Sequence, residues 1–549
     1  MIGAVIFPFL PLLPPLLPLL LSAAASGLLM VALFPPWDQT WLAWLALWPV
    51  LLGVHFDSGR DKAGREAGAV WSDRRLWTAG YAMGFLFFAG TLWWIGLVTA
   101  AGTFLLVAYM ALYPALWLVW ARWRWEAEGG ELTSAGNLAV AAELASVWTV
   151  GEWLRGWLFT GFGWNDLGVA LHRNLPLMQG ARWGGVLLLT WLVVFVNVVG
   201  VRSALRFVRE ARGRQKVRPH WDFGVAMLAV AVLFSAGMSH LLHAGREGGE
   251  RRTLRFAAIQ PDIPQSEDDP FPPEKAIRRQ LDLTEQAALF KPDLVLWPEA
   301  PVGVSARLNP SYRRGLDGLV SWMPFTLLIG SLDYHDDLLY NAAMLFSPAR
   351  PDGEAPQVYW KNHLVPFGEY APWADRLPFM RRLVPFVLDF SPGRDSGLVT
   401  MRKREAGEEP IKLAPLICFE DSLPLYGRHV ARLHPDLDVL VNITNDGWFR
   451  TSPGSAMHFA NAVFRAVELD RPLLRCGNNG VTAAVEQTGR VAATFAGNGA
   501  GVLAGELAWR PGGVTPYVRY GDWIVGLSLA LIALRLAAAR LRRGRVIRL

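Results

Sequence analysis

Three residues that could act together in nucleophilic catalysis follow short apolar segments in the second half of the chain. Glu299 lies in LVLWPEAPV, Lys361 in VYWKNHLVPFGEY and Cys418 in LAPLICFED. The thiolate is the reactive form of cysteine, a carboxylate can take its proton, and a nearby ammonium favours the thiolate and a later oxyanion. This set of residue types therefore predicts nucleophilic catalysis by a cysteine.

Each of the three residues also has an ordinary structural interpretation. A lone cysteine is usually a small buried hydrophobe. Glu299 could cap a helix and Lys361 could be a solvated surface charge. Because a sequence does not show spatial proximity, residue types alone leave both interpretations open.

The segments around these residues have the pattern of a layered α/β or α+β domain. Short apolar runs between Arg251 and Pro516 end in polar residues and predict buried strands, and residues 273–289 and 456–469 predict helices. The runs are LRFAAIQ, DLVLWPEA, TLLIGSLDY, KLAPLICFED and DVLVNITND. Chemistry in such folds gathers beyond strand ends, so we expect the three residues there.

The composition favours a membrane protein. The 549-residue chain is 52% hydrophobic and only 18% charged, and it contains 26 Trp. Since a span needs about 20 mostly apolar residues, we predict about eight of them. They are residues 20–34, 41–54, 77–98, 103–121, 138–154, 186–201, 223–241 and 523–539.

The positions of Lys and Arg predict the orientation of these spans. Basic clusters follow Val201 and Ala539, and both should be cytoplasmic. We therefore predict a membrane domain over residues 1–245, an extracytoplasmic domain over 251–516, and a last helix with a basic cytoplasmic tail over 517–549. The net charge of +6 comes largely from these clusters, which act as topology signals, so we expect no nucleic-acid partner.

The loop EWLRGWLFTGFGWNDLG, residues 152–168, falls on the same outer side. Its Trp and Phe residues suit an aromatic belt at the membrane interface. Glu152 and Arg155 could pair with each other at i and i+3 or meet a polar ligand. The belt is the better-supported interpretation from composition.

Several other residues allow more than one interpretation. His363, His429, His434 and His458 lack metal-ligand spacing, so we predict no metal. For His458, packing and active-site support both remain possible.

Cys476 is expected to pack in a core, although an oxidative bridge to Cys418 is conceivable. Two cysteines do not make a disulfide framework. Turn chemistry and substrate contact are equally supported for the residues after DVLVNIT, which are Asn445, Asp446 and Trp448.

The order of the motifs resembles a known superfamily. LWPEAPV, KNHLVPFGEY and LICFED, followed by NITNDGWF and HFANAVFRAVELDRPLLRCGNNG, are similar to the carbon-nitrogen hydrolase (nitrilase) superfamily. Together with the membrane part, EWLRGWLFTGFGWNDLG and GGVTPYVRYGDW resemble the apolipoprotein N-acyltransferase family over nearly the whole chain. The resemblance implies a multi-pass α-helical membrane protein with an inserted αββα sandwich domain.

The resemblance also implies roles for particular residues. Glu299 would be the general base, Lys361 would stabilise the tetrahedral intermediate, and Cys418 would be the nucleophile. Glu369 and Glu420 match further acidic positions that support the active site. Phe419 stands where the family often has Tyr, so a hydrogen bond from that hydroxyl does not carry over.

The implied reaction is a two-step acyl transfer without a cofactor. Cys418 would take an acyl chain from a membrane phospholipid, and the amine of an S-diacylglyceryl-cysteine apolipoprotein would then attack the thioester. We expect a monomer in the cell inner membrane with its catalytic domain on the periplasmic side. Two alternatives are a membrane-tethered amidase that passes its acyl group to water, and a transporter or assembly scaffold with an inert domain.

Overall fold

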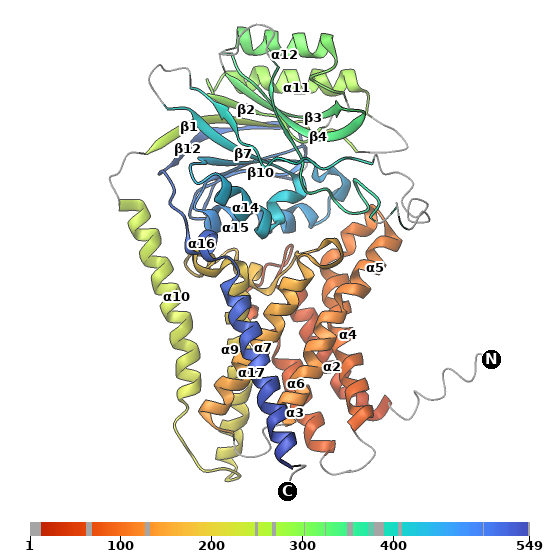
Figure 1. The fold of residues 1–549 in the computed structure, drawn as a ribbon, viewed down its shortest axis with the longest axis vertical. Helices are drawn as coiled ribbons and strands as arrows, with labels where there is room; N and C mark the ends of the chain where they lie inside the picture. The colour runs from red at the N-terminus through yellow and green to blue at the C-terminus, as the bar shows by residue number, and fades with distance from the viewer. Residues whose placement is uncertain are drawn as a thin grey trace, which may run out of the picture. The chain divides into compact units, whose positions relative to one another are not determined.

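The chain folds into two compact units (Figure 1). The membrane unit comprises Met1–Met238 and Asp522–Leu549, and the sandwich unit comprises Ser239–Gly521. The computed structural model describes residues 13–61, 69–126, 132–246, 251–265, 271–300, 302, 304–323, 325–348, 355–372, 374, 376, 389–403, 409–497 and 499–546.

The membrane unit is built from helices. Within the described ranges, six segments are long and apolar enough to cross a bilayer: Thr40–Asp57, Asp73–Leu97, Ala100–Trp125, Ala181–Ala211, Trp221–Ala244 and Trp523–Leu541. The helices are α2 (Leu13–Ala32), α3 (Trp48–Asp61), α4 (Ala69–Leu92), α5 (Ala100–Met110), α6 (Leu112–Glu126), α7 (Ser134–Arg155), α9 (Ala181–Ala211), α10 (Trp221–Arg246) and α17 (Trp523–Val546).

Two of the eight predicted spans differ from these six. The apolar part of α2, Leu16–Ala32, is shorter than the others. Helix α7 carries buried polar side chains, among them Asn137, Glu143 and Glu152, which make it less apolar than a lipid-facing helix. Because α7 packs against α6, α9 and α17, these polar groups find partners inside the unit.

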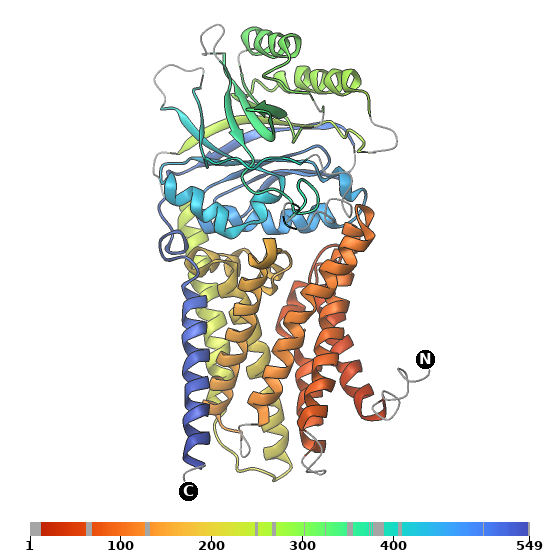
Figure 2. The same cartoon turned by 45° about the vertical axis from the view of Figure 1, so that its right-hand side comes forward.

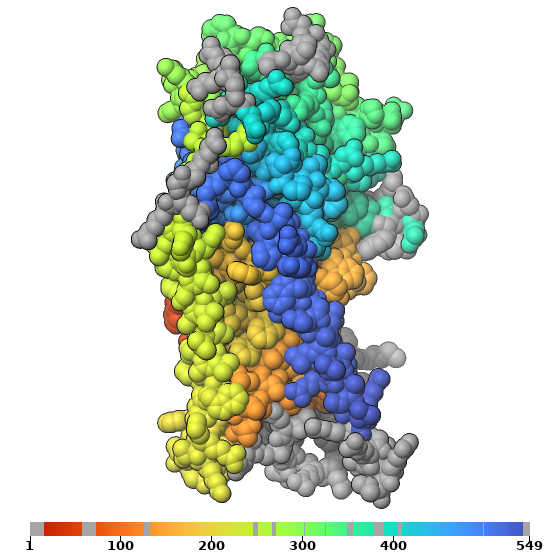
Figure 3. All heavy atoms as spheres, turned by 60° about the vertical axis from the view of Figure 1, so that its left-hand side comes forward, coloured from red at the N-terminus to blue at the C-terminus, as the bar shows by residue number. Residues whose placement is uncertain are grey.

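Burial separates central helices from peripheral ones. In α9, 83% of the apolar window is buried, whereas the value is 11% for α10 and 17% for α17. Figure 3 shows α10 and α17 at the surface. Their exposed side chains include Leu228, Val232, Leu527 and Leu534. Such apolar surfaces are what acyl chains of a bilayer would cover.

The described part of the sandwich unit contains two six-stranded sheets. The first has the order β12 (Gly501–Trp509), β1 (Arg252–Gln260), β2 (Leu294–Leu296), β3 (Thr326–His335), β4 (Leu338–Phe346) and β5 (Gln357–Trp360). The second has the order β11 (Val491–Gly497), β10 (Gly480–Val485), β9 (Leu473–Gly477), β8 (Val439–Thr444), β7 (Ile411–Ile417) and β6 (Val399–Met401). In each sheet three neighbouring strands are parallel: β1, β2 and β3, and β7, β8 and β9.

Alternation along the strands explains how both faces of the first sheet are buried. In β1, Leu254, Phe256 and Ala258 join the core between the two sheets. The intervening Ala257 and Ile259 join a second core beneath helices. Successive side chains of a strand point to opposite faces, so a continuous apolar run fits a sheet that is covered on both sides.

Helices cover the outer faces of both sheets. Figures 1 and 2 show α11 (Pro273–Ala288) and α12 (Pro310–Trp322) over the first sheet. They show α14 (Pro424–Leu433) and α15 (Gly454–Leu469) over the second. The result is the predicted αββα sandwich. The short helix α16 (Pro516–Tyr520) packs against α14 and α15.

Candidate active site

Cys418 stands at a sharp turn at the end of β7. It follows Ile417, the last residue of the strand, and opens a short 3-10 helix over Cys418–Ser422. Its φ of +52° lies in the left-handed region, which few non-glycine residues adopt. The Asn442 side chain holds this turn, because its Nδ2 donates to the carbonyl oxygens of Cys418 and Leu416, both at 3.1 Å. The cysteine remains partly exposed.

Glu299 lies three residues beyond β2, on the first sheet, and both carboxylate oxygens have partners. Oε1 accepts from Asn341 Nδ2 at 2.8 Å and lies 3.4 Å from Lys361 Nζ. Oε2 accepts from the backbone N–H of Asn445, which follows β8 of the second sheet, at 3.0 Å. Gly330 of β3 allows this loop to lie close, because a Cβ there would be 2.6 Å from Glu299 Cα.

Lys361 follows β5 and is buried between two carboxylates. Its Nζ lies 2.9 Å from Glu369 Oε1 and 3.4 Å from Glu299 Oε1. Asn341 Nδ2 donates to those same two oxygens, at 2.8 Å to Glu299 and 3.0 Å to Glu369. Glu369 Oε2 also accepts from the backbone N–H of Val365 at 2.7 Å. The ammonium is therefore held in one place by charge and by hydrogen bonds.

Burial sets the ionisation of this group. It raises the pKa of the Cys418 thiol well above its ordinary value; Glu299 and Asp446 add to that, and Lys361 opposes it. Burial also raises the pKa of Glu299, while Lys361, Asn341 and a hydrogen bond from Cys418 lower it. Burial alone would lower the pKa of Lys361, but Glu369 and Glu299 raise it. These directions favour a protonated thiol and a protonated Lys361 ammonium in the resting site.

Glu420 lies apart from the reacting groups and ties two loops together. Oε1 accepts from the backbone N–H groups of Asn362 and His363, at 2.7 and 3.0 Å. Oε2 accepts from the backbone N–H of Ile417 at 2.8 Å and from Tyr359 Oη at 2.7 Å. Burial raises the pKa of Glu420 to about 7. Its contacts fix the residue before Cys418 relative to the residue after Lys361.

Four buried charged side chains lie behind the cysteine turn, and we call them the buried quartet: Asp421, Asp446, His458 and Arg475. His458 bridges the two carboxylates, with Nε2 2.8 Å from Asp421 Oδ1 and Nδ1 2.9 Å from Asp446 Oδ1. Arg475 pairs with the same two aspartates, at 3.0 Å to Asp446 Oδ2. Burial lowers the pKa of His458, but the two aspartates outweigh burial and raise this pKa above its ordinary value, to about 8. A charged imidazole is therefore favoured between them.

The buried quartet connects to both halves of the site. Arg475 Nη1 donates to Asn442 Oδ1 at 2.8 Å, and Asn442 in turn binds the Cys418 carbonyl. Asp446 directly follows Asn445, whose N–H binds Glu299. Asn445 Oδ1 also accepts from Asn478 Nδ2 at 3.0 Å, which follows β9. Asn445 and Asp446 therefore support the site through the turn that they form.

Sequence reasoning singled out only part of this arrangement. The structure brings Glu299, Lys361, Glu369 and Cys418 together and places Glu420 as a tie between loops. Asn341, Asn442, Asp421 and Arg475 were missed. A usable signal was present for Arg475, because a charged residue between Leu474 and Cys476 in an apolar strand needs a buried partner.

Cys476 packs in the core rather than forming a bridge. It is fully buried between the sheets, where its Sγ donates to the carbonyl oxygens of Ile259 at 3.2 Å and Leu296 at 3.4 Å. Both cysteines are free. Burial raises the pKa of both thiols, but Cys418 is partly exposed whereas Cys476 is buried, so Cys476 is the less accessible of the two to a substrate.

The loop of residues 152–168 in the membrane unit is held by polar contacts from α7. Arg155 pairs with Asp166 and not with Glu152. Glu152 accepts from Trp148 Nε1 at 2.8 Å, from the backbone N–H of Leu167 at 2.9 Å and from Thr190 Oγ1 at 2.7 Å. Glu152 and Arg155 thus each bind other groups of the membrane unit, whereas the helix spacing had suggested a pair between them.

The aromatic residues of this loop divide into two groups. Trp157 and Phe159 are exposed, at 44% and 62%, as an aromatic belt requires. Trp164 is only 3% exposed and packs against Trp94, with 5.3 Å between ring centroids. It therefore belongs to the packed interior of the unit, not to its surface.

Comparison with known proteins gives a consistent result for both units. A family model described as the apolipoprotein N-acyltransferase N-terminal domain matches residues 26–199. A carbon-nitrogen hydrolase model matches residues 255–510. The two matches cover the membrane helices and the sandwich separately.

Full-length relatives match nearly the whole chain. An apolipoprotein N-acyltransferase of Geobacter metallireducens is 33% identical over 533 residues, which cover 93% of this chain and 94% of the relative. One of Vibrio vulnificus is 31% identical over 542 residues, with 95% and 97% covered. Among solved structures, a mutant amidase from Nesterenkonia sp. AN1 has a TM-score of 0.35 and 18% identity, and the match covers 46% of this chain and 92% of that one.

Proposed function

Because the chain belongs to the apolipoprotein N-acyltransferase family, we propose that Glu299, Lys361 and Cys418 form the active site at which it transfers an acyl chain. The protein is an integral membrane acyltransferase of lipoprotein maturation, and lipoproteins and membrane lipids are its partners. One observation supports this site above the others: the thiol, the carboxylate and the ammonium interact with each other at the end of the two sheets.

In the first step, Cys418 attacks the ester carbonyl of a membrane phospholipid. The thiol proton passes to Glu299 as the bond from Sγ to the carbonyl carbon forms. Negative charge collects on the carbonyl oxygen, and the Lys361 ammonium stabilises it. The ester bond from carbon to glycerol oxygen then breaks, Glu299 returns the proton to that oxygen, and a lysophospholipid leaves.

In the second step, the α-amine of an S-diacylglyceryl-cysteine apolipoprotein attacks the thioester. Glu299 takes a proton from the attacking nitrogen, Lys361 again stabilises the oxyanion, and the bond from carbon to Sγ breaks. The leaving thiolate recovers its proton from Glu299. Thioester to amide is downhill, so the step needs no external energy source.

The proposed substrates explain why a hydrolase-like sandwich is joined to membrane helices. Moving an acyl chain into water costs about 0.8 kcal/mol per methylene, so long chains stay in the bilayer. The site has to reach the lipid. The basic clusters after Val201 and Ala539 support a sandwich unit outside the cytoplasm, on the periplasmic side of the inner membrane. We propose that a monomer suffices for this chemistry, since the site as proposed needs no group from a second chain.

Two matched cysteine variants test this assignment. The full-length protein is reconstituted with phospholipid and a diacylglyceryl-cysteine peptide, and N-acylated peptide is measured. Cys418→Ala is expected to abolish transfer, whereas Cys476→Ala is expected to retain it because Cys476 only fills the core. Transfer by Cys418→Ala at the wild-type rate would refute the site. Free fatty acid as the main product of the wild type would favour the amidase alternative.

A further inference from the structure

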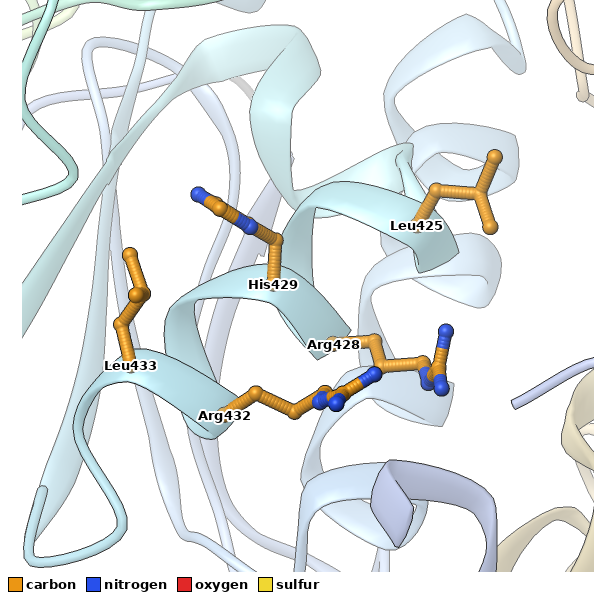
Figure 4. A pocket seen from close by; sticks show the side chains of 5 residues that line it. All are labelled: Leu425, Arg428, His429, Arg432 and Leu433. Carbon is orange, nitrogen blue, oxygen red and sulfur yellow. The ribbon is translucent and has the colours of Figure 1, made fainter. Parts of the chain in front are cut away.

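Helix α14 has an outer face of basic and apolar side chains, which we call the α14 stripe. Its residues are Leu425, Arg428, His429, Arg432 and Leu433. Their spacing of i, i+3, i+4, i+7 and i+8 places them along one side of the helix. They line a cavity of about 450 Å³, and Figure 4 shows all five side chains coming from α14.

The α14 stripe is exposed while the opposite face is buried. Leu425 and Leu433 are 43% and 55% exposed, at the two ends of the stripe. Tyr426 and Val430 of the opposite face are buried. Apolar side chains beside Arg and His, with no acidic residue among the five, are typical of helices that lie on lipid headgroups. Guanidinium groups also match phosphate oxygens in geometry and charge.

A second, independent observation is the short connection along the chain from α16, which α14 contacts, to the span α17. Arg428 Nε donates to the carbonyl oxygens of Tyr517 and Val518 in α16, both at 3.2 Å. Helix α16 ends at Tyr520, and the span α17 begins only three residues later, at Trp523. Three residues reach at most about 11 Å. The element that α14 contacts is therefore separated from the span by no more than this length of chain.

The buried face of α14 is linked to the candidate active site. Tyr426 Oη and Tyr359 Oη share a hydrogen bond of 2.7 Å, and Tyr359 donates to Glu420 at 2.7 Å. Glu420 in turn holds Ile417, next to Cys418. A lipid seated on the outer face of α14 would therefore lie one helix away from the residues that position the nucleophile.

From these observations we propose that the α14 stripe is a docking surface for the phosphate-bearing headgroups of the bilayer. It seats the sandwich unit on the lipid surface and brings donor phospholipid to the site. The proposal rests on the proposed function in taking a phospholipid as the acyl donor. Docking on lipid does not require acyl transfer. It can therefore be tested in a protein that lacks the proposed nucleophile.

The first experiment measures lipid contact directly. An environment-sensitive fluorophore is attached to Leu433→Cys in a full-length Cys418→Ala background, where Cys476 is fully buried. Arg314→Cys, at an exposed position on α12, is the matched control. In nanodiscs of equal parts phosphatidylethanolamine and phosphatidylglycerol, nitroxide-labelled lipid is expected to quench position 433 strongly and position 314 weakly. Equal quenching at the two positions would overturn the docking surface, whatever the fate of the thioester mechanism.

The second experiment separates docking from chemistry by kinetics. Arg432→Gln is expected to raise KM for phospholipid about fivefold, the change for one basic residue at a lipid surface, and to affect kcat less. Arg314→Gln should leave both values unchanged. An unchanged KM in Arg432→Gln would contradict headgroup binding.

Discussion

Glu299, which follows a strand of the first sheet, accepts a hydrogen bond of 3.0 Å from the backbone N–H of Asn445, which follows a strand of the second. The same carboxylate meets Lys361 through its other oxygen. The proposed base is therefore held from both halves of the sandwich. Changes that loosen either half should reduce the rate before they unfold the protein.

Replacing Lys361 should remove stabilisation of the oxyanion. We expect Lys361→Met to lower kcat for acyl transfer by about 10²- to 10³-fold, the usual cost of one such group. The measurement is single-turnover acylation by protein that is shown to be folded. Lys275→Met, an exposed position on α11, is the control. A loss of less than threefold in Lys361→Met would show that Lys361 is not the stabilising cation.

Replacing Glu369 should change the pH dependence on the alkaline side. Glu369 and Glu299 raise the pKa of Lys361 against the effect of burial. Glu369→Gln removes one of these charges, so Lys361 should lose its proton at a lower pH than in the wild type. Activity that depends on the Lys361 ammonium is then expected to begin to fall at a lower pH in Glu369→Gln than in the wild type. The same alkaline profile of kcat in the two proteins would contradict this role of Glu369.

A methyl group at Gly330 should displace the base. A Cβ there would lie 2.4 Å from the Pro298 carbonyl oxygen and 2.5 Å from the Ala300 nitrogen, so the loop that carries Glu299 has to move. A misplacement of about 1 Å can cost about 10²-fold in rate. Gly330→Ala should therefore lose activity in a folded protein. Gly318→Ala on α12, where a Cβ meets nothing within 4 Å, should retain it. Equal activity in the two variants would contradict this role.

His458 should stabilise the fold only while it is protonated. Its folded pKa is raised to about 8 from an ordinary 6.5, so the stabilisation is full below the ordinary value and is lost as the pH rises through about 8. The shift corresponds to about 2 kcal/mol. The difference in Tm between wild type and His458→Gln should therefore be larger near pH 6 than near pH 9. A difference that does not vary with pH would contradict the raised pKa of His458.

The sequence could predict the layers and the strand ends, because both depend on local patterns. Apolar runs such as KLAPLICFED end where β7 ends, and Cys418 follows directly. The family could be predicted from the order of the motifs along the chain, and the two family models match successive regions, residues 26–199 and 255–510. Glu299 and Cys418 could thus be chosen as candidate site residues without knowledge of the distance between them.

The partners of these residues could not be predicted from the sequence, because they meet only through tertiary contacts. Asn341 stands inside the apolar run LLYNAAMLF, and its role appears only when β4 and β5 bring it beside Lys361. Likewise, Arg155 pairs with Asp166 across a loop and not with the residue one helical turn before it. Helix spacing describes neighbours on a helix, whereas long-range pairing is set by the fold.

The most direct test of the mechanism is to detect the acyl group on Cys418. Purified wild-type protein is incubated with labelled phospholipid in the absence of acceptor, and the labelled peptide is identified by mass spectrometry before and after hydroxylamine. We expect a hydroxylamine-labile acyl adduct on the peptide that contains Cys418, and none on Cys418→Ala. No adduct on a wild type that still transfers acyl chains, or an adduct that persists in Cys418→Ala, would contradict the mechanism.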